Sequence, residues 1–211
     1  MGFKKNDFIE VDFVAKTSKG EVFDSTLKEE LDKLGSKSSA KPFVFSLGNG
    51  MFLKGIEEFL MDKDVGKYEI TLEPENAFGN RDVSLIRLVP ESIFKQHNVR
   101  PISGHVFNFD GNLAKILSVN GGRVRVDFNN PLAGKIVIYN LEVKRIVSDL
   151  NEKIKSLNDF FLRGNFKFEL EGKKLILEVP EKMKNIAILF KDKYKEILDL
   201  DLEIKESLKK E

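Results

Sequence analysis

Hydrophobic and polar residues alternate along the first third of the chain in the manner of half-buried strands. Residues 7–14 and 21–25 show this pattern on either side of a turn at residues 17–20, which predicts a β-hairpin. A polar stretch at residues 26–41 is expected to be a surface excursion with one short helix. Alternation returns at residues 68–72, which predicts another strand.

Residues 42–55, PFVFSLGNGMFLKG, concentrate bulky apolar side chains around a glycine-bearing turn. The pattern predicts a strand with Phe43 and Phe45 on one face. A sharp reversal is expected at residues 48–50 because glycine tolerates positive φ, and a short helix is expected from Gly55 onward. Such a cluster forms either ordinary core or a ligand pocket, and the pattern alone favours core.

A separate β unit is predicted between residues 85 and 130. Alternating runs at residues 105–109, 114–119 and 123–128 are joined by Asp110-Gly111-Asn112 and Asn120-Gly121-Gly122. Both connections are typical of tight hairpin turns. Residues 89–94 are read as a short capped turn that precedes these three strands.

The chain continues with a long predicted strand at residues 135–146 and then changes character. Ser148 and Asp149 are suited to cap a helix that ends at Gly164. A hairpin is expected over residues 166–179, a single helix over residues 183–198, and a last strand near residues 200–204.

Composition excludes several classes of function. The 211 residues carry 35 Lys and Arg against 34 Asp and Glu, for a net charge of +1, so no basic field indicates nucleic acid. Cysteine is absent and no apolar run could span a bilayer, which predicts a cytoplasmic protein without a membrane segment. The two histidines, His97 and His105, are too few for a zinc or nickel site, and neither a metal nor a cofactor is expected.

Four short motifs resemble the FKBP-type peptidyl-prolyl cis-trans isomerases in order and spacing: Glu21–Thr26 (EVFDST), Pro42–Phe45 (PFVF), Leu53–Glu57 (LKGIE) and Pro74–Gly79 (PENAFG). The segment Asn129–Gly134 (NPLAG after Asn129) resembles the return from an inserted β domain in the SlyD-like class. The added C-terminal unit resembles the long-chain archaeal members of the family.

This resemblance implies an α+β fold with three parts. Residues 1–85 and 130–147 are expected to form the isomerase domain, an antiparallel sheet wrapped on a short helix. Residues 86–129 are expected to form a small β domain inserted in the flap, with a chaperone role. Residues 148–211 are expected to form a small α/β domain through which two copies of the chain form a homodimer.

The resemblance also implies the site. Ile56 would lie at the pocket floor, where many relatives have tryptophan, and the backbone N–H of Leu53 would meet a substrate carbonyl. Asp24 either orients the twisted amide or only caps the adjacent turn. Phe13 and Phe78 stand where the family usually has tyrosine. The implied catalytic set is Asp24, Phe13, Phe23, Phe43, Leu53, Ile56, Phe78 and Tyr139.

The resemblance implies a peptidyl-prolyl isomerase that acts on proline-containing peptides and also binds unfolded proteins as a folding chaperone. The alternative is a non-catalytic holdase with a vestigial pocket. More than half of the apolar residues of the insert are expected to be its own core, and the remainder to contact client chains. The implied substrate-binding residues are Phe52, Leu132, Phe94, Val106 and Phe107.

Overall fold

The computed structural model describes residues 2–36, 39–96, 98–109 and 112–207, so His97 and the last four residues lie outside the described part. The chain forms two compact units, residues 1–71 with 138–211, and residues 72–137. Among the described helices, none combines the length and the apolarity that crossing a membrane requires.

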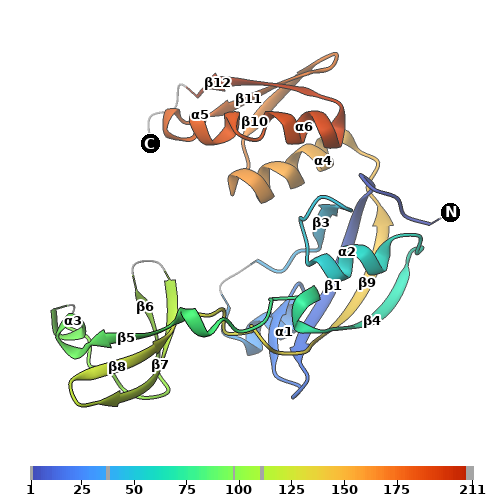
Figure 1. Ribbon diagram of the computed structural model, residues 1–211. Coiled ribbons are helices and arrows are strands. Elements are labelled where there is room, and N and C mark those ends of the chain that lie inside the picture. Colours follow the sequence, from blue (N-terminus) through green and yellow to red (C-terminus); the bar gives the residue numbers. More distant parts are fainter. Residues whose placement is uncertain (1, 37–38, 97, 110–111, 208–211) are drawn as a thin grey trace. The chain divides into compact units, whose positions relative to one another are not determined.

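The first unit contains a five-stranded sheet of order β2-β1-β9-β4, with β3 also paired to β1 (Figure 1). The strands are β1 (Phe8–Thr17), β2 (Val22–Ser25), β3 (Phe43–Ser46), β4 (Gly66–Leu72) and β9 (Val137–Ile146), and the helices beside them are α1 (Lys28–Lys33) and α2 (Lys54–Leu60). Helix α2 buries Ile56 and Leu60 completely. The mixture of antiparallel strands and short helices agrees with the predicted α+β class.

Alternation in the sequence predicts these strands well. Along β1 the buried residues recur at every second position from Val11 to Thr17. β2 pairs antiparallel with β1, which confirms the predicted hairpin. The rings of Phe43 and Phe45 stack with centroids 5.3 Å apart, as expected for side chains two positions apart on one face of a strand.

The second unit is built on an antiparallel sheet of order β5-β8-β7-β6. Its elements are η1 (Pro74–Asn76), η2 (Val83–Leu85), β5 (Ile86–Pro90), α3 (Glu91–Gln96), β6 (Val106–Phe109), β7 (Asn112–Asn120) and β8 (Arg123–Asp127). The prediction missed β5 and placed a turn where α3 begins. The pairing of β5 with β8 joins residues that are 33 (Pro90 and Arg123) to 41 (Ile86 and Asp127) positions apart, and a local pattern does not report such pairing.

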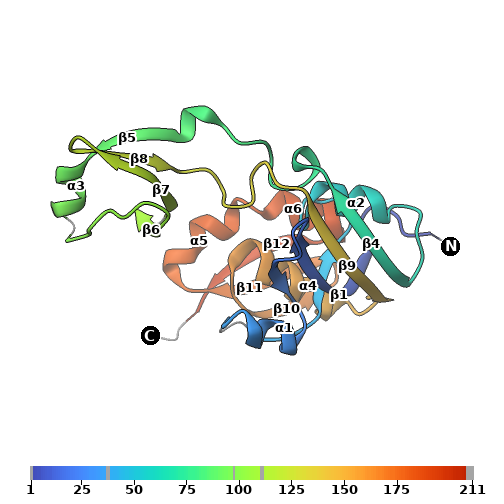
Figure 2. The same cartoon turned by 90° about the horizontal axis from the view of Figure 1, so that it is seen from below.

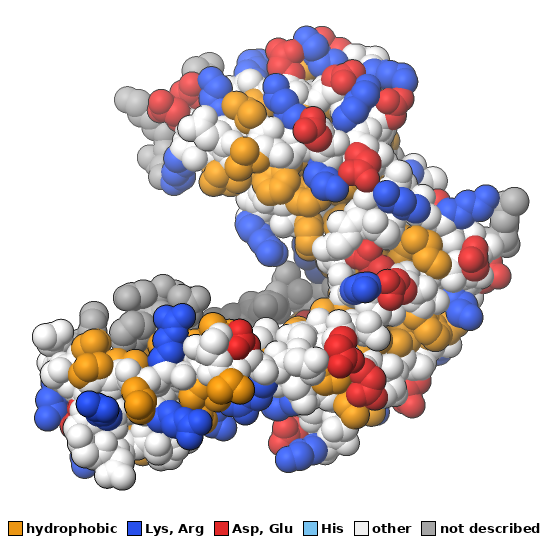
Figure 3. All heavy atoms as spheres, in the orientation of Figure 1, with side chains coloured by type: hydrophobic (Ala, Val, Ile, Leu, Met, Phe, Trp, Pro, Cys, Tyr) orange, Lys and Arg blue, Asp and Glu red, His pale blue; other side chains and the backbone are white. Residues whose placement is uncertain are grey.

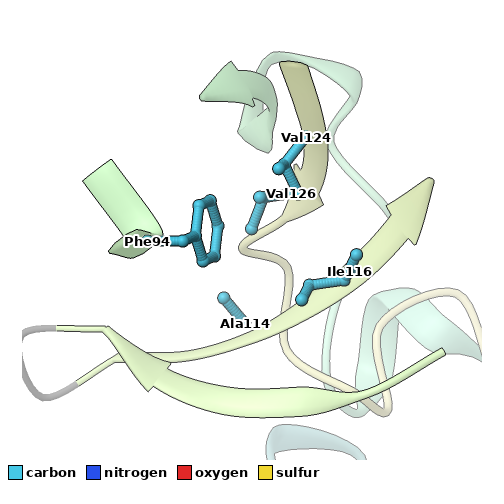
Figure 4. Packing of buried hydrophobic residues seen from close by; sticks show 5 residues of the cluster. All are labelled: Phe94, Ala114, Ile116, Val124 and Val126. Carbon is cyan, nitrogen blue, oxygen red and sulfur yellow. The ribbon is translucent and has the colours of Figure 1, made fainter. Parts of the chain in front are cut away.

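A small hydrophobic core lies on one face of this second sheet (Figure 4). Phe94 of α3 points toward the strand residues, and its side chain is 1% exposed. The core is formed by Phe94, Ala114, Ile116, Val124 and Val126, with Val89, Phe107 and Phe128 packed against it.

The side chain of Asn129 holds together the chain segment that leads into β5 and the segment that follows β8. Its Nδ2 donates to the carbonyl oxygen of Asp82 at 2.9 Å and to Oδ1 of Asp127 at 2.7 Å, while its Oδ1 accepts from the N–H of Asp82 at 2.8 Å. Arg81 adds an ion pair to Asp127. Asn129 therefore satisfies backbone groups of a chain segment 47 residues away, which explains why an asparagine opens the Asn129–Gly134 motif.

The last part of the first unit contains a second, three-stranded sheet of order β10-β11-β12 (Figure 2). Its elements are α4 (Leu150–Leu157), a π-helical turn (Asn158–Leu162), β10 (Lys167–Glu171), β11 (Lys174–Val179), α5 (Glu181–Ile188), α6 (Lys191–Leu198) and β12 (Asp201–Glu206). The carboxylate of Asp149 accepts a hydrogen bond from the N–H of Glu152 at 2.8 Å, which confirms the predicted helix cap.

The prediction of one helix over residues 183–198 is wrong, because the chain breaks between α5 and α6. Phe190 leaves helical geometry at φ −98°, ψ 4°. Its ring stacks on Phe161 with centroids 4.7 Å apart. Packing against the π-helical turn thus overrides a continuous helical pattern.

Candidate functional site

The predicted pocket residues of the first unit gather around a cavity of about 530 Å³. The side chains of β1, β2 and β3 form one part of its wall, and the segment that carries α1 forms another. The lining residues are Phe13, Phe23, Asp24, Ser25, Thr26, Leu31, Leu34, Ser36, Ser39, Lys41, Pro42, Phe43 and Phe52.

Phe52 is the centre of the aromatic cluster that lines this cavity. Its ring lies 5.4 Å from Phe13, 5.3 Å from Phe43 and 5.6 Å from Tyr139, measured between centroids. The contacts to Phe43 and Tyr139 are edge-to-face, the arrangement that aromatic quadrupoles favour. Phe23 contacts Tyr139 in the same way at 6.0 Å. The rings hold one another in place and leave an apolar surface toward the cavity.

Two residues of the predicted pocket lie behind its surface. Ile56 is 0% exposed and does not line the cavity, although we expected it at the floor. Tyr139 is also buried, and it supports the rings of Phe13, Phe23 and Phe52 from β9. Phe52, predicted only to contact substrate, takes the lining position.

Glu57 fixes the loop that carries Phe52. Its side chain is buried, with one carboxylate oxygen accepting from the N–H of Phe52 at 2.7 Å and the other from the N–H of Gly50 at 3.1 Å. Leu53 caps α2 in extended geometry, and its N–H donates to no acceptor in the described part of the chain. The loop therefore presents one free donor beside the aromatic cluster.

Asp24 supplies the one carboxylate among the described residues that line the cavity. One of its oxygens accepts a hydrogen bond from the N–H of Ser25 at 2.8 Å, which supports the turn-capping alternative. Partial burial raises the pKa of Asp24, and this hydrogen bond offsets only part of the rise. Burial, and secondarily the charge of Asp24, also raises the pKa of Tyr139. The Tyr139 phenol is therefore neutral at physiological pH.

The remaining predicted site residues belong to the second unit. Phe78 and Leu132 are half-buried in the segments before and after the second sheet. Val106 is 53% exposed on β6, and Phe107 is half-buried against the core. Phe94 is the exception among the predicted client contacts, since its complete burial leaves it no surface for a client chain.

Sequence reasoning missed two contributors to the site. Glu57 stands next to Glu58 in a short helix, and only its position on the same helical face as Leu53 and Leu60 pointed to burial. The polar segment at residues 26–41 was read as a surface excursion, yet Leu31 and Leu34 line the cavity. Their three-residue spacing was the available signal.

A different cavity, of about 430 Å³, lies over β1, β4 and β9. Its charged groups neutralise one another, since Lys144 contacts Asp12 at 3.1 Å and Glu142 at 3.5 Å. It therefore offers no unpaired charged group to a ligand, and the aromatic cavity is the stronger candidate. No cluster of three or more potential metal ligands occurs among the residues that the structure describes.

Two family descriptions and several relatives match this chain. Residues 2–94 match the family described as FKBP-type peptidyl-prolyl cis-trans isomerase, and residues 87–132 match the family described as FKBP26, IF domain. The chain is 31% identical over 147 residues to the short-type peptidyl-prolyl cis-trans isomerase of Methanocaldococcus jannaschii, covering 68% of this chain and 93% of that relative. It is 32% identical over 149 residues to the FKBP-type 16 kDa isomerase of Escherichia coli, with the same coverage. Identity to the isomerase SlyD of Aeromonas hydrophila is 27% over 149 residues, covering 69% of this chain and 65% of that relative.

Proposed function

This chain belongs to the FKBP-type peptidyl-prolyl cis-trans isomerases and is SlyD-like, and on that basis we propose that the aromatic cavity around Phe52 is its active site. The observation that carries the proposal is the contact of Phe52 with Phe13, Phe43 and Tyr139 at 5.3–5.6 Å. The substrate proline occupies the cavity between these rings and Phe23.

Isomerisation of an X-Pro bond needs an apolar cavity more than it needs an acid or a base. Rotation about an X-Pro bond crosses a barrier of roughly 18–20 kcal/mol because twisting removes amide resonance. The twisted amide has less charge separation than the planar one, so an apolar site that excludes water favours it over the ground state. The free N–H of Leu53 is suited to hold a substrate carbonyl in the required orientation.

In this proposal the carboxylate of Asp24 contributes less to catalysis than the aromatic rings do. We expect Asp24→Asn to lower kcat/KM for a Phe-Pro tetrapeptide less than about tenfold, because an amide oxygen can still accept the Ser25 hydrogen bond. The assay is protease-free proline isomerisation as a function of pH. A loss of about 10³-fold would overturn the apolar-cage mechanism in favour of a charge-based one.

The raised pKa of Asp24 makes one contribution to the pH dependence of the stability. Because burial raises its pKa in the folded state, Asp24 contributes stability below the pKa of the unfolded chain, and this contribution is lost as pH rises through the folded pKa. Asp24→Asn should therefore be more stable than wild type at neutral pH. This difference in stability between the two proteins should be smaller in acid. Equal stability of the two proteins at pH 7 and pH 3 would contradict this assignment.

A chaperone role of the second unit is supported by the open face of its sheet. The ladder places Leu88 and Val106 on the face opposite the core, where they are 64% and 53% exposed. Figure 3 shows hydrophobic side chains exposed among lysines and arginines on this unit. An unfolded client chain in extended form binds to this face or to an adjacent sheet edge.

Replacing both Leu88 and Val106 by serine should weaken suppression of client aggregation while the tetrapeptide rate stays unchanged. Val83→Ser is the matched control, since Val83 is exposed on η2, outside the four strands of the sheet. If the double variant suppresses aggregation as well as wild type, the face does not bind clients. If wild type suppresses aggregation but no protein accelerates isomerisation, the holdase alternative is correct.

The C-terminal elements are proposed to pair two copies of the chain. Helix α5 and its end leave Ile186, Ile188 and Leu189 exposed, which supports such an interface. A solution mass of one chain at micromolar concentration would contradict it.

A further inference from the structure

A second groove continues from the aromatic cavity toward α4. This flanking groove has a volume of about 410 Å³ and shares Lys41, Pro42 and Phe43 with the aromatic cavity. Its other wall comes from α4, the π-helical turn and the residue that follows it, including Phe160 and Arg163. We infer that the flanking groove binds the part of the substrate chain beside its proline and selects an acidic side chain there.

The acidic groups of the groove are already paired. Arg145 contacts Glu10 at 2.6 Å and Glu152 at 2.7 Å. Asp159 is held by Lys41 at 2.9 Å. Every carboxylate that lines the groove is therefore in an ion pair, with Arg145 shared by two of them, and the four basic side chains of the lining still outnumber its three carboxylates.

Two basic side chains of the same groove are not neutralised. Lys155 and Arg163 are both exposed, and neither forms an ion pair with any residue that the structure describes. The guanidinium carbon of Arg163 lies 5.8 Å from the ring centroid of Phe160, a cation–π contact that leaves its N–H groups open to solvent. The groove thus offers uncompensated positive charge beside an aromatic wall, which a carboxylate complements.

The substrate chain is the occupant that this geometry favours. The inference rests on the proposed active site, because the aromatic cavity and the groove share Lys41, Pro42 and Phe43, so that a substrate chain leaving the cavity over these residues enters the groove. Phe43 lines both spaces and Phe160 lines the groove, so apolar residues near the acidic one find aromatic contacts. A tetrapeptide is too short to use this groove fully, whereas an unfolded protein is not.

The test uses the full chain and twelve-residue fluorescent peptides with one Phe-Pro bond. Each peptide carries Glu or Lys at one position, scanned from two to five residues on either side of the proline. At the best position we expect about three- to tenfold tighter binding of the Glu peptide by fluorescence anisotropy, falling at high salt. The same ratio should appear in KM for isomerisation, with kcat unchanged.

Charge reversal in the groove is compared with charge reversal on α5, outside the groove. In the variant Lys155→Glu with Arg163→Glu the preference should invert toward the Lys peptide, whereas Lys184→Glu on α5 should leave it unchanged. A tetrapeptide should be isomerised equally by all these proteins. Equal binding of Glu and Lys peptides at every position, or a Glu preference that survives the reversal, overturns the inference. If wild type does not isomerise the tetrapeptide but still prefers the Glu peptide, and the charge reversal inverts that preference, the proposed active site is wrong while the groove remains supported.

Discussion

Replacing Phe43 by alanine is expected to lower kcat/KM for a Phe-Pro tetrapeptide by about 10- to 100-fold, equivalent to about 1.4–2.8 kcal/mol of transition-state stabilisation. The ring of Phe43 lines the cavity and meets Phe52 edge-to-face at 5.3 Å. Its removal opens the cage to water, and water stabilises the planar amide over the twisted one. The measurement is protease-free isomerisation at a substrate concentration well below KM.

The variant should remain folded, which makes the loss interpretable. Phe43 is only half-buried, so truncation costs about 1–3 kcal/mol of a typical stability of about 5–15 kcal/mol. Phe59→Ala is the matched control, because Phe59 is partly exposed and contacts Tyr68 at 5.7 Å without lining the cavity. If both variants keep wild-type activity, the aromatic cavity is not the active site.

Replacing Glu57 by glutamine is expected to lower both stability and activity. Its two carboxylate oxygens accept the N–H groups of Gly50 and Phe52, and an amide keeps only one acceptor while turning a donor toward the other N–H. Hydrogen bonds to a charged acceptor contribute about 1.5–3 kcal/mol each, so unfolding free energy should fall by about 2–4 kcal/mol. Loss of the loop geometry around Phe52 and Leu53 should reduce kcat/KM by about tenfold.

Glu58→Gln provides the control for this prediction. Glu58 is exposed one position further along α2, and within the described part of the chain its one ion pair is with Lys54, at 3.7 Å on the surface. Its substitution should change unfolding free energy by less than about 0.5 kcal/mol. Chemical denaturation and tetrapeptide kinetics on both variants decide the outcome. Lowered stability with unchanged kinetics would make Glu57 a purely structural residue.

Local patterns predicted those parts of the fold whose partners are near in sequence. The shared face of Phe43 and Phe45 and the β1–β2 hairpin follow from two-residue alternation. Asp149 was predicted as a cap because the acceptor and the donor are three residues apart. The aromatic side chains that line the cavity were predicted from the family resemblance. Such a resemblance identifies residues that lie together in the fold even when they are far apart in the sequence.

Features that depend on distant contacts were not predicted. β5 exists because β8 pairs with it, and the break before α6 places Phe190 against Phe161. Ile56 matches the family's floor position, yet its smaller side chain is fully buried while Phe52 lines the cavity. In each case the deciding interaction is tertiary packing, which overrides a weak local preference.

On the ribosome, the second unit is ready to fold before the first can close its sheet. β9 lies between β1 and β4 in the sheet order and ends only at Ile146, whereas the last strand of the other sheet ends at Asp127. Because domains fold as their segments emerge during translation, a nascent chain completes the β5–β8 sheet while the β9 position is still empty. Tyr139, which supports three rings of the aromatic cavity, arrives on that late strand. The nascent chain therefore completes the sheet proposed to bind clients before the cavity proposed as its active site.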